Sequence, residues 1–67
     1  SDRRPRVLEL HAKAHAKLGE FERAIAYTTE ALGLLEQSGA EAERLQTLRD
    51  MLATFEVGLN GKESSPR

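Results

Sequence analysis

The chain has no cysteine and no tryptophan, and only one tyrosine and two phenylalanines occur among its 67 residues. Without cysteine, no disulfide bond can staple the fold and no thiolate can bind a metal ion. A chain of this length forms one domain, which buries only about 60 % of the surface that its unfolded chain exposes. We therefore expect a single small domain of marginal stability.

A long hydrophobic run and an excess of one charge are also absent. No apolar stretch approaches the roughly 18 residues that a membrane span requires, and no secretory leader is visible. The formal net charge is −1, so the chain lacks the basic footprint of a nucleic-acid-binding domain. We therefore expect a cytoplasmic protein that binds neither nucleic acid nor a membrane.

Apolar and small residues recur at helical spacing from Phe21 to Leu35. One face of this stretch consists of Phe21, Ala24, Ile25, Thr28, Ala31, Leu32 and Leu35. This spacing is typical of an amphipathic helix, and Ala24 and Ala31 are small enough to let a partner helix approach closely. Just before this helix, Gly19 can adopt the left-handed backbone angles that end a helix. The pattern predicts two antiparallel helices joined by a glycine turn.

The run before Gly19 predicts a first helix from Pro5 to Leu18. Pro5 suits the first turn of a helix, where its missing N–H group is not needed. We expect the inner face of this helix to consist of Leu8, His11, Ala12, His15 and Leu18. Residues 1–4 are expected to form a flexible end.

The segment over residues 38–59 contains the third predicted helix. Ser38 and Gly39 are expected to end the second helix at Gln37. Ser38 and Glu41 have the spacing of a capping box, in which the hydroxyl accepts from the backbone and the glutamate reaches back. The third helix is therefore expected to start directly after Ser38.

An apolar seam defines the core-facing side of this third helix, and Met51 lies beside it. The seam consists of Leu45, Leu48, Leu52, Phe55 and Leu59. Its steps of three and four residues predict a helix that runs to about Val57. Residues 60–67 have no apolar pattern and are expected to be a disordered tail.

The hairpin residues resemble the second half of a tetratricopeptide repeat. The matching residues are Ala12, Leu18, Gly19, Phe21, Ala24, Ile25, Ala31 and Leu32. This family repeats a helix–turn–helix unit about every 34 residues. The chain departs from the family pattern at Leu8, His11, His15, Thr28 and Glu36. The resemblance implies an all-α fold in which residues 5–37 form one repeat. Residues 38–59 would then form a capping helix, or the first helix of a partial second repeat, at the end of a longer array.

His11 and His15 lie four residues apart, so both imidazoles fall on one face of the first helix. Such a pair can chelate a transition metal, but zinc requires three or four ligands. The zinc-protease motif also needs a glutamate directly after the first histidine, and this chain has Ala12 there. We therefore expect two partly buried histidines and no metal site.

No group of residues predicts catalysis. Thr28 lies in the interior of a helix, and Ser38 is already explained as a cap. The carboxylates fall on predicted solvated faces, which do not favour acid–base catalysis, and no glycine-rich loop could hold a phosphate. We expect neither enzymatic activity nor a bound cofactor.

The resemblance implies a non-catalytic scaffold that binds a protein or peptide. Family members bind ligands in the groove between successive first helices, which here are the first and third helices. Transferred to this chain, the groove residues are Arg6, Glu9, Leu10, Lys13, Lys17, Glu43, Arg44, Thr47, Asp50 and Met51. Leu10 and Met51 would be apolar anchors, and the basic side chains would pair with acidic ones. Glu9 stands where members that clamp a terminal carboxylate have a basic or amide side chain, so that clamp is not expected.

Two other interpretations stay open. A three-helix microtubule-interacting-and-trafficking domain also has the pattern formed here by Gly19, Phe21 and Ala24, and it binds peptide helices in its grooves. Its second helix is usually longer than the one predicted here. In the other interpretation, the chain is a purely structural end cap that binds nothing.

A second apolar strip is predicted on the first helix. Val7, Leu10 and Ala14 lie three and four residues apart, on a side that the third helix cannot also cover. Because exposed apolar patches commonly mark contacts, we expect weak self-association through the first helix or contact with another chain.

Overall fold

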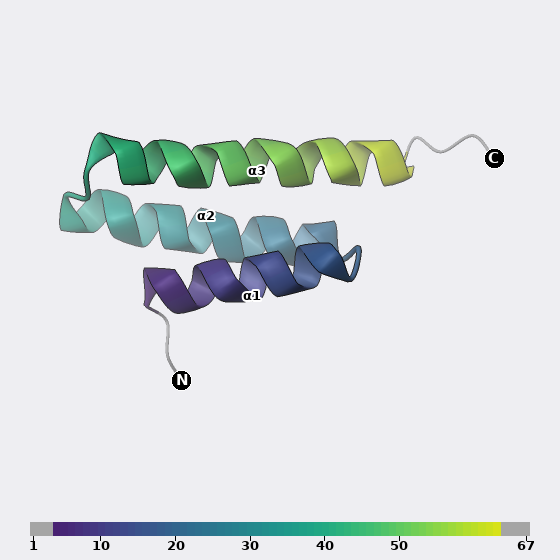
Figure 1. Ribbon diagram of the computed structural model, residues 1–67, viewed down its shortest axis with the longest axis horizontal. Coiled ribbons are helices and arrows are strands. Elements are labelled where there is room, and N and C mark those ends of the chain that lie inside the picture. The colour runs from purple at the N-terminus through teal and green to yellow at the C-terminus, as the bar shows by residue number, and fades with distance from the viewer. Residues whose placement is uncertain (1–3, 64–67) are drawn as a thin grey trace.

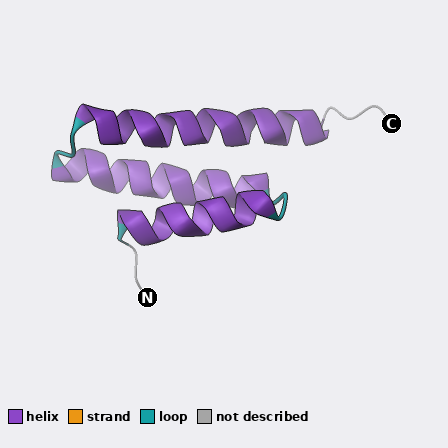
Figure 2. Ribbon diagram, in the orientation of Figure 1, coloured by secondary structure: helices purple, strands orange, loops and turns teal. Residues whose placement is uncertain are grey.

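The computed structural model describes residues 4–63, with side chains for residues 4–61. Within this range the chain forms α1 (Pro5–Lys17), α2 (Phe21–Ser38) and α3 (Ala42–Glu63), as Figure 1 shows. No strand occurs in the described range (Figure 2). The predicted all-α fold of three helices is therefore confirmed.

The helix boundaries differ from the prediction mainly in α3. Helices α1 and α2 end within one residue of their predicted ends, whereas α3 continues to Glu63. The residues 60–63 were expected to belong to a disordered tail. They continue the helix because none of them is proline and each added residue closes one more backbone hydrogen bond. The remainder of the predicted tail and residues 1–3 of the predicted flexible end lie outside the described residues.

The three helices pack side by side, with α2 set behind α1 and α3. Helices α1 and α3 run in the same direction, and the fainter α2 lies farther from the viewer across the gap between them (Figure 1). Helix α2 runs antiparallel to both and packs against both. The overall dimensions are 44 × 26 × 14 Å. Helices α1 and α3 therefore meet along one broad face of the molecule.

The turn between α1 and α2 depends on Gly19, as predicted. Gly19 has a φ angle of 81°. Its N–H donates to the carbonyl of Ala16 at 3.0 Å, and the N–H of Glu20 donates to the carbonyl of His15 at 2.9 Å. These two bonds form a Schellman motif. The prediction that Leu18 faces inward is wrong: its side chain is 72 % exposed, because α1 ends at Lys17 and the chain reverses there.

The turn between α2 and α3 repeats this geometry at Gly39, whose φ angle is 75°. The N–H of Ala40 donates to the carbonyl of Leu35 at 3.0 Å. The predicted capping box is wrong, because Ser38 is the last residue of α2 and its hydroxyl donates to the carbonyl of Leu35 at 3.0 Å. The first bond of α3 instead runs from the N–H of Leu45 to the carbonyl of Glu41 at 3.1 Å.

Two small clusters form the buried core, and each takes one residue from every helix. The first consists of Leu8, Ala31 and Leu48, and the second of Ala12, Ala24 and Phe55. The three alanines are fully buried, as predicted for contacts between closely packed helices. Tyr27 and Met51 pack against both clusters and therefore connect them.

Thr28 is also fully buried, on the face of α2 where the pattern predicted it. Its hydroxyl donates to the carbonyl of Ala24 at 2.8 Å. A buried hydroxyl without a partner would cost about 1–3 kcal/mol. Bonding within its own helix lets this short side chain occupy the core without such a penalty.

Candidate interaction groove

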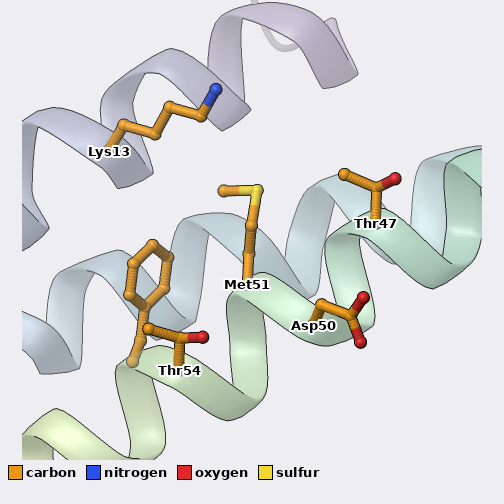
Figure 3. A pocket seen from close by; sticks show the side chains of 6 residues that line it. Lys13, Thr47, Asp50, Met51 and Thr54 are labelled. Carbon is orange, nitrogen blue, oxygen red and sulfur yellow. The ribbon is translucent and has the colours of Figure 1, made fainter.

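An open hollow of about 420 Å³ lies between α1 and α3. It is lined by Lys13 from α1 and by Thr47, Asp50, Met51, Thr54 and Phe55 from α3 (Figure 3). We call this hollow the groove. Counted from Thr47, the other four α3 residues lie three, four, seven and eight positions farther along the chain. All five therefore share one face of the helix. The periodicity of α3 thus places all five on the side of the helix that faces the groove.

The floor of the groove is apolar and continuous with the core. Phe55 is 8 % exposed and belongs to the second cluster, whereas Met51 is half-buried and packs against both clusters. In Figure 3 the side chain of Met51 extends from α3 toward α1. A thioether adapts to apolar groups of different shapes. An apolar side chain of a ligand can therefore pack on Met51 and Phe55 without displacing residues of the core.

The two walls carry polar side chains that remain accessible to solvent. Lys13 is exposed on α1, and Thr47, Asp50 and Thr54 are exposed on α3. Gln46 Nε2 donates to Asp50 Oδ1 at 2.9 Å. A carboxylate accepts several hydrogen bonds, so Asp50 can also accept one from a ligand. The groove thus has a cationic wall on α1 and a wall of hydroxyl and carboxylate groups on α3.

An ion pair connects α1 to α3 beside the groove. Glu9 lies one turn before Lys13 and is only 7 % exposed. Arg44 Nη2 donates to Glu9 Oε1 at 2.5 Å, and Lys13 Nζ lies 3.8 Å from Glu9 Oε2. This contact joins residues that are 35 positions apart in the chain. It fixes the two walls relative to each other. It also pairs the charge of Glu9 with side chains of the same molecule, so this charge is not presented to a ligand.

The predicted partner-binding residues separate into three groups. Four of them line the groove, namely Lys13, Thr47, Asp50 and Met51. Glu9 and Arg44 bind each other instead of presenting free charges. Arg6, Leu10 and Lys17 are exposed on α1 but do not line the groove, and Glu43 is exposed on α3.

Sequence reasoning missed two groove residues, Thr54 and Phe55. Phe55 was assigned to the apolar seam, and it does belong to the core as well as to the groove floor. Thr54 lies one turn beyond Asp50, at the spacing that joins neighbours on a helix face. Continuing the predicted wall by one turn would have found it.

The two histidines lie on a different side of α1 from the groove residues. His11 is exposed and His15 half-buried, so the prediction that both are partly buried is wrong for His11. Both rings stack on Tyr27, each with a centroid distance of 5.3 Å. His15 Nδ1 also lies 2.6 Å from Glu20 Oε1. These contacts give both rings a structural role, and the described residues contain no group of three or more ligands that could hold a metal ion.

Comparison of the chain with protein-family models, with curated proteins and with solved structures found no match. Within the described range, none of the helices combines the length and the apolar content that crossing a bilayer requires. The groove is therefore the feature of the molecule from which a function can be inferred.

Proposed function

We propose that the chain is a non-catalytic protein–protein interaction module. Its groove between α1 and α3 would bind a peptide or a protein surface. The observation that carries this proposal is the apolar floor formed by Met51 and Phe55 between two polar walls. Binding sites for proteins commonly combine an apolar centre with a polar rim. A ligand side chain seated on Met51 would lose contact with water, while Lys13 and Asp50 would orient its polar neighbours.

Two further features support a module of the tetratricopeptide type. The hairpin turns at Gly19 with a positive φ angle, and Ala12, Ala24 and Ala31 are buried between closely packed helices. In such a module α3 is the first helix of the next unit, and it runs in the same direction as α1 (Figure 1). The alternatives are a three-helix trafficking-type domain, which would also bind a peptide, and a structural end cap, which would not.

Selection from a random peptide library tests the proposal. Phage-displayed peptides would be panned on the immobilised 67-residue chain, and enriched sequences would be synthesised and measured by fluorescence anisotropy. Thr54→Arg places a long side chain in the groove and is expected to weaken binding at least about tenfold, or roughly 1.4 kcal/mol. Thr29→Arg is the matched control, because Thr29 is exposed on α2 and does not line the groove.

The two variants make the result decisive. Peptides that bind Thr54→Arg as tightly as Thr29→Arg would place the binding site elsewhere and contradict the proposal. A library that yields no specific peptide would favour the structural end cap. Far-UV circular dichroism would first establish that both variants retain the helical content of the original chain.

A further inference from the structure

The groove opens on the face of the molecule that lies opposite α2. In Figures 1 and 3 the ribbon of α2 passes behind α1 and α3, and all six lining residues come from α1 and α3. Lys13 lies two positions from both His11 and His15, whose rings stack on Tyr27 of α2. Two positions correspond to about 200° around a helix. Lys13 therefore projects from the side of α1 that faces away from α2.

The two rims of this open side carry opposite charges. On α1, Lys13 follows Arg6 by seven positions and precedes Lys17 by four. On α3, Asp50 follows Glu43 by seven positions. Such steps keep side chains on one face of a helix, and all five side chains are exposed. We call Arg6, Lys13 and Lys17 the cationic rim, and Glu43 and Asp50 the acidic rim.

The charges beside the groove floor are already paired, whereas the rims keep capacity for a ligand. Arg44 Nη2 donates to Glu9 Oε1. Lys13 Nζ lies 3.8 Å from Glu9 Oε2, which is longer than a hydrogen bond, so its N–H donors can still bind a ligand acid. Asp50 accepts one bond from Gln46 and has further acceptor sites. The rims can therefore pair with a ligand without breaking contacts within the fold.

The groove suits a helix better than an extended peptide. Both of its walls are helices, whose backbone N–H and C=O groups are bonded within each helix. The hydroxyl of Thr47 donates to the carbonyl of Glu43 at 3.1 Å, so its proton is also used within α3. An extended peptide buried on Met51 would leave backbone groups without partners, which is unfavourable. A helix bonds its own backbone and presents only side chains to a groove.

A helix of about three turns matches the length of the rims. The cationic rim extends over eleven residue steps from Arg6 to Lys17, or about 16 Å at 1.5 Å per residue. A helix laid along the groove would contact α1 and α3 from the side opposite α2 and complete a four-helix arrangement. Its apolar side chains would pack on Met51 and Phe55, which form the groove floor.

We propose, on the basis of the function proposed above, that the groove binds an amphipathic helix of a partner protein. Acidic side chains follow one flank of its apolar stripe, and basic side chains follow the other. The acidic flank faces the cationic rim, and the basic flank faces the acidic rim. Turning such a helix end for end would exchange the rims that its flanks face. The charge pattern of the partner therefore also determines the direction in which its helix lies.

Four synthetic peptides of equal length test this pattern by fluorescence anisotropy on the full 67-residue chain. Three share one leucine stripe and one outer face, and their flanks are glutamate and lysine, glutamate only, or lysine only. The mixed helix is expected to bind at least about fivefold more tightly than either uniform helix at low salt, because each uniform helix places like charges on one rim. The difference should shrink at high salt.

The fourth peptide is the mixed helix with a proline at the centre of its outer face. It keeps every side chain that faces the groove, but proline interrupts the helix. We expect its binding to weaken at least about tenfold, or roughly 1.4 kcal/mol. A peptide that binds in an extended form would tolerate this change.

Asp50→Lys tests the acidic rim, and Glu56→Lys is its matched control. Both variants replace an exposed acid of α3 by a cation, but Glu56 does not line the groove. With Asp50→Lys, the glutamate-only helix is expected to bind at least as tightly as the mixed helix. With Glu56→Lys, the mixed helix should keep its advantage. Circular dichroism would verify that both variants fold.

The outcomes separate the helix proposal from the proposed function. The helix proposal is wrong if the groove binds library peptides but does not prefer the mixed helix. It is also wrong if the proline peptide binds as tightly as the mixed helix, or if Asp50→Lys and Glu56→Lys have the same effect. In these cases the groove remains a binding site. If Thr54→Arg weakens neither the library peptides nor the designed helices, both proposals are wrong.

Discussion

The ring of Phe21 lies directly on the backbone of Gly58. A Cβ atom at position 58 would approach Phe21 Cε1 to 2.7 Å and Phe21 Cζ to 2.8 Å. Phe21 is the first residue of α2, and Gly58 lies in the second half of α3. Glycine inside a helix lowers its stability by roughly 0.5–1 kcal/mol relative to alanine, and here it allows an aromatic ring to reach the helix backbone.

Replacing Gly58 by alanine is therefore expected to destabilise the fold. Displacing the ring costs about 1–3 kcal/mol through overpacking, which exceeds the gain in helix propensity of about 1 kcal/mol. The free energy of unfolding, measured by urea titration and circular dichroism, should fall by about 1 kcal/mol.

Gly33→Ala is the matched control for this prediction. Gly33 also lies inside a helix, but no atom lies within 4 Å of a Cβ added there. This variant is expected to gain up to about 1 kcal/mol of stability. Equal stabilisation by the two changes would mean that Phe21 does not pack on Gly58.

Enlarging Ala24 tests the close approach of the helices. Ala24 is fully buried in the second cluster, so Ala24→Leu should overpack the core and lower the free energy of unfolding by roughly 1–3 kcal/mol. Ala26→Leu provides the comparison, because Ala26 is exposed on the same helix. A thermal melting temperature equal in the two variants would show that Ala24 does not face a neighbouring helix.

The two cationic partners of Glu9 are expected to contribute unequally. Arg44 Nη2 lies 2.5 Å from the nearly buried carboxylate, whereas Lys13 Nζ lies 3.8 Å away on a side chain that is 56 % exposed. Arg44→Gln removes the main charge partner and should cost about 1–3 kcal/mol of stability. Lys13→Gln should change stability by less than about 1 kcal/mol.

Urea titrations of Arg44→Gln and Lys13→Gln, each with and without Glu9→Gln, give the coupling energies directly. A larger coupling of Glu9 to Lys13 than to Arg44 would contradict the observed geometry.

Local spacing predicted most of the fold. The steps of three and four residues identified the buried face of α2, including the polar residue Thr28, because burial there depends on position along the helix. Gly19 identified the first turn because few other residues adopt a positive φ angle. The same reasoning failed at Ser38: its hydroxyl could serve either the end of α2 or the start of α3, and spacing alone does not decide between two helix ends.

Contacts between distant segments could not be predicted in this way. The bond between Glu9 and Arg44 depends on how far α3 is shifted along α1, which is set by packing against α2. The stacking of both histidines on Tyr27 depends on the rotation of α1 about its own axis. His11 lies one position before the buried Ala12, or about 100° around α1, and this offset is enough to leave it exposed. Likewise, four groove residues were named from the family resemblance, and their convergence required the three-dimensional fold.

Met51 belongs both to the groove and to the core, so its motion couples the two. Its side chain belongs to the groove floor and also joins the two clusters of the core. Fluctuations that open either cluster must therefore move the same thioether that a groove ligand would contact. A bound ligand that immobilises Met51 would slow local opening of both clusters, and so of α2 around Ala24 and Ala31, although it touches no residue of α2. Amide hydrogen exchange along α2 would then reveal occupancy of the groove through the dynamics of a helix that contributes no side chain to its lining.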